Sequence, residues 1–384
     1  MINLRAATNT ISRPAARALV QRLERAANRH DTAALLECYA ADAVAISPQF
    51  ATLTGRTAIA RSWDRLFTTL PDCRLEVSDV LVDGDRIAIL GGIAATDVCG
   101  WFGLPPTGSP IRYRITILCT VRDGAIVHEE RIYDSAGVVG RLEKARVDRD
   151  LQMAAGVQQA LLARTALATS FCDVVTRSVP CRAIGGDFFE IVELPSGSVG
   201  LLVGDVAGKG PAAALLAAML QGVFATEAQA GSAPSHAVSR MNQVLTARHI
   251  ESRFATIVYA VLSPDGRLVY TSAGHNPPAI VGRDGVRRLS AGGPILGAFA
   301  DATFDEESIV LNRGDVLLMF SDGVTEARNV SGEEFGDARL METATSATGD
   351  PNALVERIIA AVREFSTGVE QTDDMTVAVA RFGK

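Results

Sequence analysis

The sequence predicts an α+β protein of two to three domains, and three observations support this prediction. Its 384 residues are more than a single domain usually needs. Helical periodicity near the N-terminal end gives way to alternating strand patterns, the order expected of an α+β domain. Strand-like apolar runs return in the last 220 residues, together with an Ala-rich helical segment. We therefore expect a domain at 1–136, a connecting helix at 137–165 and a second domain at 166–384.

The composition excludes several classes of protein. A hydrophobic fraction of 48% with 21% charged residues is typical of a globular chain rather than a disordered one. No apolar stretch reaches 18 residues, and no basic run is present, so neither a membrane span nor a nucleic-acid partner is predicted. The six cysteines form no C-x-x-C pair, which argues against a thiolate zinc site. We expect a cytoplasmic protein with reduced thiols.

The first domain is predicted to be a curved antiparallel sheet around helices. Its helices have apolar faces at a period near 3.6, and its strands alternate apolar and polar residues. Asp83-Gly84 and Asp123-Gly124 are turn dipeptides that join neighbouring strands. In chain order we expect helices at 14–30, 32–39 and 57–70, followed by strands at 75–82, 86–96, 111–122 and 125–133.

Three segments of this domain, "HDTAALLECYAADAVAISP", "TGRTAIARSW" and "GAIVHEERIYD", resemble the SnoaL-like, nuclear transport factor 2-like family. The resemblance implies a cone-like half-barrel that often encloses a small-molecule pocket and often dimerises. The family includes isomerases and cyclases, which leaves such an activity open as an alternative function. His128 and Asp134 lie near the end of the last predicted strand, but no matched acid–base pair completes a site.

The connecting segment 137–165 has a helical apolar seam. Val147, Leu151, Ala154 and Leu161 lie on it, with Gln158 at an intervening position. Two interpretations remain open. The helix packs on its own domain, or it transmits movement between the two domains.

Acidic residues in the second domain follow or precede apolar runs that are typical of buried strands. Asp187, Asp205 and Asp322 occupy three such positions, and Asp373-Asp374 the fourth. Each is also a common turn residue when taken alone. Residues 166–384 have a net charge of −9, and carboxylates brought together at strand ends would repel one another. Mg²⁺ or Mn²⁺, which prefer oxygen ligands, would neutralise such a cluster.

The motifs around these residues resemble the SpoIIE/RsbU branch of the PPM metal-dependent serine/threonine phosphatases. They are "GGDFFE", "VGDVAGKGPAAALLAAML", "FATIVYAVL", "YTSAGHNPP", "LNRGDVLLMFSDGVTEARN" and "TDDMTVAVA", in the family's order. The resemblance covers about residues 150–382. It implies an αββα phosphatase sandwich with a centre of two Mn²⁺ or Mg²⁺ ions between its sheets.

The resemblance also assigns roles to individual residues. Asp205 would bridge both ions, and the backbone carbonyl of Val206 would complete one shell. Asp322 and Asp373 would bind the other ion, Asp187 would act directly or through water, and one of Asp373 and Asp374, preferably the first, would coordinate. The expected catalytic residues are Asp187, Asp205, Asp322 and Asp373, and the expected metal ligands are these four with Val206 and Asp374.

The function implied by the resemblance is dephosphorylation of phosphoserine or phosphothreonine in one step, with water as nucleophile. The implied substrate is a phosphorylated STAS-domain anti-sigma-factor antagonist in bacterial partner-switching signalling. The first domain would regulate the reaction, with or without a small-molecule ligand, in a homodimer. A non-catalytic scaffold with a phosphatase fold remains an alternative. Glu190, Lys209 and His275 are further polar residues of these motifs.

Overall fold

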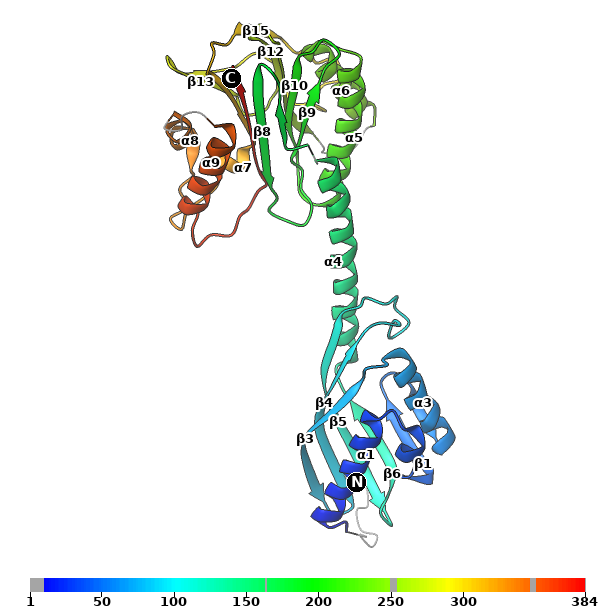
Figure 1. The fold of residues 1–384 in the computed structure, drawn as a ribbon. Helices are drawn as coiled ribbons and strands as arrows, with labels where there is room; N and C mark the ends of the chain where they lie inside the picture. Colours follow the sequence, from blue (N-terminus) through cyan, green and yellow to red (C-terminus); the bar gives the residue numbers. More distant parts are fainter. Residues whose placement is uncertain (1–9, 163, 249–253, 346–349, 384) are drawn as a thin grey trace. The chain divides into compact units, whose positions relative to one another are not determined.

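The computed structural model describes residues 10–162, 164–248, 254–345 and 350–383. The chain divides into two compact units, Met1–Asp150 and Leu151–Lys384. Helix α4 (Ser135–Leu161) overlaps the predicted connecting segment and runs across the boundary between the units (Figure 1). Each unit has its own buried core.

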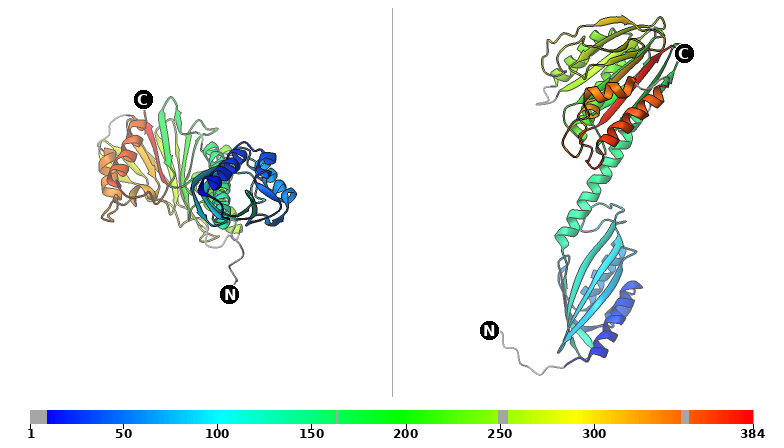
Figure 2. Two further views of the ribbon diagram at one scale, coloured as in Figure 1. Left: turned by 90° about the horizontal axis from the view of Figure 1, so that it is seen from below. Right: turned by 90° about the vertical axis from the view of Figure 1, so that its left-hand side faces the viewer.

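The described residues of the first unit form an open six-stranded sheet with helices α1, α2 and α3 and the first part of α4. Its strand order is β2-β1-β6-β5-β4-β3. Figure 2 shows α1, in blue, lying along the sheet formed by the cyan strands. The elements are α1 (Arg13–Asn28), α2 (Thr32–Leu36), β1 (Tyr39–Ser47), β2 (Ala51–Thr54), α3 (Arg56–Thr69), β3 (Arg74–Asp83), β4 (Arg86–Thr96), β5 (Pro110–Arg122) and β6 (Ala125–Ile132).

The meander β3-β4-β5-β6 confirms the predicted antiparallel strands. The sequence patterns did not predict β1 and β2, nor the parallel pairing of β1 with β6. The register of that pair shifts between Tyr39 and Val44, so β1 lacks a clean alternation along its length. Asp134 accepts a hydrogen bond from the Gly137 amide, and this contact is typical of a helix N-cap residue.

The buried arginine of the first unit is paired with a carboxylate. Arg131 Nε donates to Glu129 Oε1 at 2.5 Å, and the Tyr39 hydroxyl donates to Glu129 Oε2. Burial acts to lower the pKa of Arg131, but Glu129 and Tyr39 hold it above its usual value. The guanidinium therefore remains charged inside the core.

The second unit has the αββα layering predicted from the family resemblance. One sheet has the order β15-β12-β11-β10-β9 and the other β14-β13-β16-β17-β8-β7, with antiparallel pairing within each. Helices α5 and α6 cover one sheet, and α8 and α9 cover the other (Figure 1). One apolar core lies between the sheets, and each helical layer adds another.

The strands of the second unit are β7 (Ala166–Ala168), β8 (Cys172–Val179), β9 (Phe188–Glu193), β10 (Val199–Val206), β11 (Ala255–Leu262), β12 (Arg267–Ala273), β13 (Ala279–Gly282), β14 (Gly285–Arg288), β15 (Glu307–Val310), β16 (Val316–Phe320) and β17 (Met375–Phe382). Its helices are α5 (Pro211–Gln229), α6 (Pro234–Ala247), α7 (Asp322–Thr325), α8 (Gly336–Thr345) and α9 (Pro351–Phe365). Among the described residues, α5 alone has the length and hydropathy of a membrane span. Its buried side chains, including Leu216, Leu220 and Phe224, belong to the core beneath β10 and β11.

Candidate active site

Strand register brings the predicted aspartates to one place. Asp187 immediately precedes β9, and Gly204 of β10 pairs with Phe188, so Asp205 lies beside Asp187 at the end of the same strand pair. Asp322 begins α7, separated from β16 by Ser321 alone, and Asp373 lies two residues before β17, the partner of β16. The carboxylates therefore meet where the ends of the two sheets face each other.

Contacts between the sheets hold Asp187 in this position. Its Oδ2 atom accepts hydrogen bonds from Ser321 Oγ at 2.7 Å and from Thr376 Oγ1 at 2.6 Å. Both hydroxyls come from the sheet that contains β16 and β17. Sequence analysis did not single out Ser321 or Thr376, although both lie inside the quoted motifs beside Asp322 and Asp374.

The electrostatics of the cluster are those of like charges crowded together. Burial, followed by the charges of Asp322 and Asp373, raises the pKa of Asp205 to about 7. Burial and then Asp205 raise the pKa of Asp187 well above its usual value, while burial and Asp373 raise that of Asp322. A cation would relieve this repulsion because it favours the charged form of each carboxyl.

Oxygen atoms that could bind such a cation gather around Gly186. A Cβ atom at Gly186 would stand 2.6 Å from the Val206 carbonyl oxygen, 3.0 Å from Asp205 Oδ1 and 3.3 Å from the Gly208 carbonyl oxygen. Three oxygens thus converge on one point that a side chain would fill. A donor set made only of oxygen suits Mg²⁺ or Mn²⁺, so the residues fit the implied ions.

Carboxylates alone do not complete a metal shell. Within the described ranges, no three His, Cys, Asp or Glu side chains are grouped so that they could hold one ion. The donors present would therefore be combined with backbone carbonyls and water, the shell that Mg²⁺ usually keeps in proteins.

Asp373 and Asp374 differ sharply in their surroundings. Asp374 is 4% exposed, and its two carboxylate oxygens accept the backbone N–H groups of Cys181 at 2.8 Å and Gly186 at 2.9 Å. The Asp373 side chain is 43% exposed and lies 3.0 Å from Lys209 Nζ. Asp374 thus holds the loop that precedes Asp187, while the Asp373 carboxylate stays partly exposed and contacts Lys209.

Two other polar residues of the motifs have structural partners. His275 Nδ1 is hydrogen-bonded to Thr256 Oγ1 at 2.8 Å, and burial lowers the pKa of His275 to about 4, so its ring is neutral at pH 7. Thr256 lies opposite Asp205 in the strand pair β10–β11. Glu190 accepts a hydrogen bond from Gln221 of α5 at 3.0 Å.

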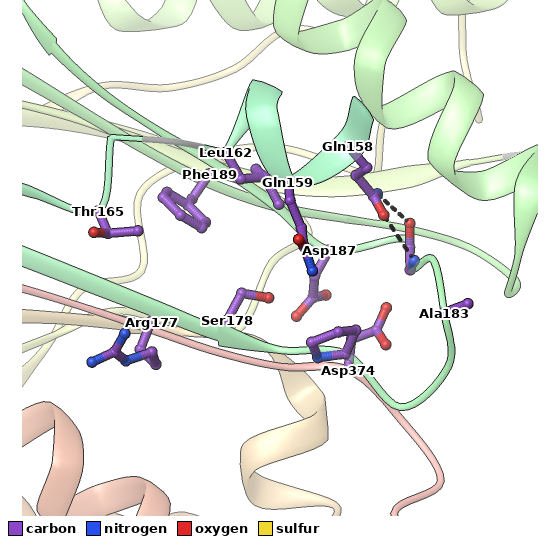
Figure 3. Close-up of a pocket in the computed structure, with 12 residues that line it drawn as sticks. Gln158, Gln159, Leu162, Thr165, Arg177, Ser178, Ala183, Asp187, Phe189 and Asp374 are labelled. Carbon is purple, nitrogen blue, oxygen red and sulfur yellow. Dashed lines mark hydrogen bonds between the residues drawn. The ribbon is translucent and has the colours of Figure 1, made fainter. Parts of the chain in front are cut away.

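A cavity of about 270 Å³ lies beside the cluster, between the end of α4, β8 and the loop before β9 (Figure 3). Asp187 and Asp374 line it, as do Gln158 and Leu162 of α4. Gln158 Nε2 donates to the Gly185 carbonyl at 2.8 Å, and the Gly185 amide donates back to Gln158 Oε1 at 3.1 Å. Helix α4 therefore contacts the backbone two residues before Asp187.

The αββα layering of the second unit is the fold of PPM-type phosphatase domains. Residues 195–383 match the family described as stage II sporulation protein E (SpoIIE), and residues 20–129 match the SnoaL-like domain. The chain therefore contains a segment similar to the SnoaL-like domain, followed by a segment similar to the SpoIIE family.

Individual relatives agree with this assignment. Phosphoserine phosphatase RsbU of Bacillus subtilis is 31% identical over 189 residues, which is 48% of this chain and 56% of that protein. Protein IcfG of Synechocystis sp. is 30% identical over 232 residues, 53% of this chain and 37% of that protein. The chain thus matches about half or less of each. The SiaA-PP2C domain of Pseudomonas aeruginosa shares the fold, with a TM-score of 0.55, 19% identity and coverage of 62% of this chain and 98% of that one.

Replacing Asp374 by Ala is expected to destabilise the second unit by about 3–5 kcal/mol. The change removes two hydrogen bonds to a charged group and leaves buried N–H groups without an acceptor. Asp373→Ala is the matched control, and we expect it to change stability by about 0.5 kcal/mol or less because its carboxylate is half exposed. Urea denaturation of the full chain measures both. Equal losses in the two variants would contradict the distinction.

Proposed function

We propose that this chain is a metal-dependent serine/threonine protein phosphatase. The observation that carries the proposal is the group of aspartates at the facing sheet ends, whose pKa values are raised by burial and by one another. The names of the relatives RsbU and RsbP, each a phosphoserine phosphatase, support it. The proposed location is the cytoplasm.

Residues at the ends of different strands would have different roles in this reaction. When bound, two Mn²⁺ or Mg²⁺ ions would lower the pKa of a shared water and neutralise phosphoryl oxygens. Asp205 and the Val206 carbonyl would hold the ions on the β10 side, and Asp322 and Asp373 on the β16–β17 side. Asp187, already held by two hydroxyls, would contribute directly or through water. The chain needs no nucleophilic side chain for this reaction, because water attacks phosphorus.

Asp205→Asn is expected to lower the rate at least about 100-fold, together with the affinity for Mn²⁺. An amide cannot supply the negative charge with which Asp205 would hold the ions. The measurement is Mn²⁺-dependent release of nitrophenol from p-nitrophenyl phosphate, with Mn²⁺ binding followed separately. Asp265→Asn, in an exposed turn, is the control. Normal turnover by Asp205→Asn would refute the metal centre, and a wild-type chain without turnover would favour the scaffold alternative.

The proposed substrate is a phosphorylated STAS-domain anti-sigma-factor antagonist, as the family resemblance implies. Phosphate release from a phosphoserine-bearing STAS protein would be compared with release from a phosphotyrosine peptide. Release from both would indicate nonspecific hydrolysis. A homodimer remains a prediction, which sedimentation equilibrium would measure. Val147 and Leu161 of the α4 seam are 56% and 48% exposed, as expected for a helix face that pairs with a second copy.

We also propose that helix α4 regulates the reaction. Gln158 is the polar residue in the seam of α4, and its amide makes both hydrogen bonds to Gly185. Gly185 and Gly186 lead directly into Asp187, and Asp374 holds the Gly186 amide. A shift of α4 along or about its axis would therefore move the backbone that positions Asp187.

Gln158→Ala should lower turnover about tenfold and weaken Mn²⁺ binding, because two hydrogen bonds to the loop before Asp187 are lost. Gln159→Ala is the control, since Gln159 is exposed on the same turn of α4 and lines the same cavity. The assay is again Mn²⁺-dependent phosphatase activity of the full chain. Identical activities of the two variants would remove α4 from the regulatory route.

We also propose that the first unit binds a small-molecule ligand. One cavity of about 30 Å³, room for about two waters, is lined by Trp63, Trp101 and Arg131. Trp63 Nε1, Trp101 Nε1 and Arg131 Nη2 are buried donors without an acceptor in the described structure. Glu129 already balances the charge of Arg131. The cavity therefore favours a neutral carbonyl oxygen on an aromatic molecule, whose remainder would extend past the half-buried Gln49 and Phe50.

Neither His128 nor Asp134 lines that cavity, so the isomerase or cyclase alternative gains no support from it. The chain has two tryptophans, and both line the cavity, so their indole N–H signals in a ¹H–¹⁵N spectrum report on it alone. We expect acetophenone to shift both signals downfield and ethylbenzene, which lacks the oxygen, to leave them in place. Equal responses to the two probes would exclude a carbonyl site.

A further inference from the structure

Lys209 makes an ion pair inside the aspartate cluster. It lies in the loop between β10 and α5, and its Nζ atom is 3.0 Å from Asp373 Oδ2. The same ammonium donates to the Thr372 carbonyl. About a third of the Lys209 side chain is exposed. The positive charge thus reaches the cluster from its solvent side and contacts the carboxylate that is proposed to bind a metal ion.

A lysine at this position is unusual for this chain, because nearly all of its basic residues are arginines. Lysine occurs at three of the 37 basic positions, namely 144, 209 and 384. Among the described residues, every other ion pair is made by arginine or histidine. Arginine grips a carboxylate through a rigid two-pronged contact, whereas lysine offers one compact charge on a flexible stem. A lysine is therefore the basic residue that leaves a carboxylate most readily.

We propose that Lys209 is an internal counter-cation that holds Asp373 until a divalent ion takes its place, and that the released ammonium then binds the phosphate of the substrate. The second half rests on the proposed phosphatase function, and the first does not. Asp373 lies close enough to Asp205 and Asp322 to raise their pKa values. Lys209 reduces that repulsion, and a doubly charged ion would reduce it further.

Replacement of Lys209 by a divalent ion at Asp373 needs no rearrangement of the backbone. Lys209 reaches Asp373 only through its terminal atom, and rotation of its four-carbon stem would turn the ammonium toward the solvent side of the cluster. A phosphate held there by the metal centre would be negatively charged, as the Asp373 carboxylate is. It would therefore give the Lys209 ammonium a new partner. Lys209 would thus be a residue for binding the substrate, without a part in proton transfer.

The test of the first half measures metal binding without turnover. In the full chain, Lys209→Met should bind Mn²⁺ about two- to fivefold more tightly at its weaker site, followed by the electron paramagnetic resonance signal of free Mn²⁺. Lys209→Gln serves as a second neutral variant, and Lys209→Arg should bind no more tightly than wild type. Lys144→Met, on the exposed part of α4, is the matched control.

A double-mutant cycle with Asp373→Asn separates the direct pair from a general charge effect. If Lys209 acts through Asp373, Lys209→Met should leave the Mn²⁺ affinity of the Asp373→Asn chain unchanged. Unaltered Mn²⁺ affinity of Lys209→Met and Lys209→Gln, or an equal gain in the Asp373→Asn background, would overturn the counter-cation. A wild-type chain that binds no Mn²⁺ would instead refute the proposed metal centre.

The second half is tested at saturating Mn²⁺ with inorganic phosphate as the probe. Lys209→Met should weaken inhibition by phosphate and raise KM about three- to tenfold, with a smaller change in kcat, because one charged contact to phosphate is lost. Lys209→Arg should restore both values within about twofold. Unchanged phosphate inhibition in Lys209→Met would show that the released ammonium does not reach the substrate.

Discussion

Repulsion among carboxylates crowded at the facing ends of two sheets is the constraint on which the rest of the second unit depends. Burial and mutual charge raise the pKa of Asp205 to about 7, and they raise the pKa of Asp187 well above its usual value. Several features of the fold compensate for this. Two hydroxyls bind Asp187, an ammonium pairs with Asp373, and the missing side chain of Gly186 leaves a space edged by oxygens. Each of these features is a response to negative charge.

The same arrangement explains why the two aspartates of the "TDDMT" motif are not equivalent. Asp374 is turned into the protein and holds the backbone of the loop before Asp187, so its oxygens are already used. Gly185 permits this close approach, because a Cβ atom there would lie 1.9 Å from Asp374 Oδ2. Gln158 of α4 holds the opposite side of that loop. One short loop therefore connects a helix, a structural carboxylate and a proposed metal ligand.

The first unit contains a buried cation, in contrast to the carboxylate cluster of the second unit. Its buried Arg131 is balanced by Glu129, which in turn accepts the hydroxyl of Tyr39. Breaking such a buried pair leaves an uncompensated charge, which typically costs about 3–5 kcal/mol, so the pair constrains the interior. Among the described residues that line the cavity of this unit, the buried side-chain atoms without a partner are the donors Trp63 Nε1, Trp101 Nε1 and Arg131 Nη2, which distinguishes this cavity from the oxygen-lined site of the other unit.

Local patterns in the sequence determined most helices and strands of the first unit, and they located the acidic positions at strand ends of the second, because periodicity and turn residues act over a few neighbours. They did not find β1 and β2, whose pairing includes a parallel contact with β6 and an interrupted register. Only the tertiary structure decided which of Asp373 and Asp374 stays accessible, and that Ser321, Thr376 and Gln158 support Asp187. The physical reason is that these contacts join residues up to 189 positions apart. Their geometry arises from the packing of one sheet on another, which no local pattern records.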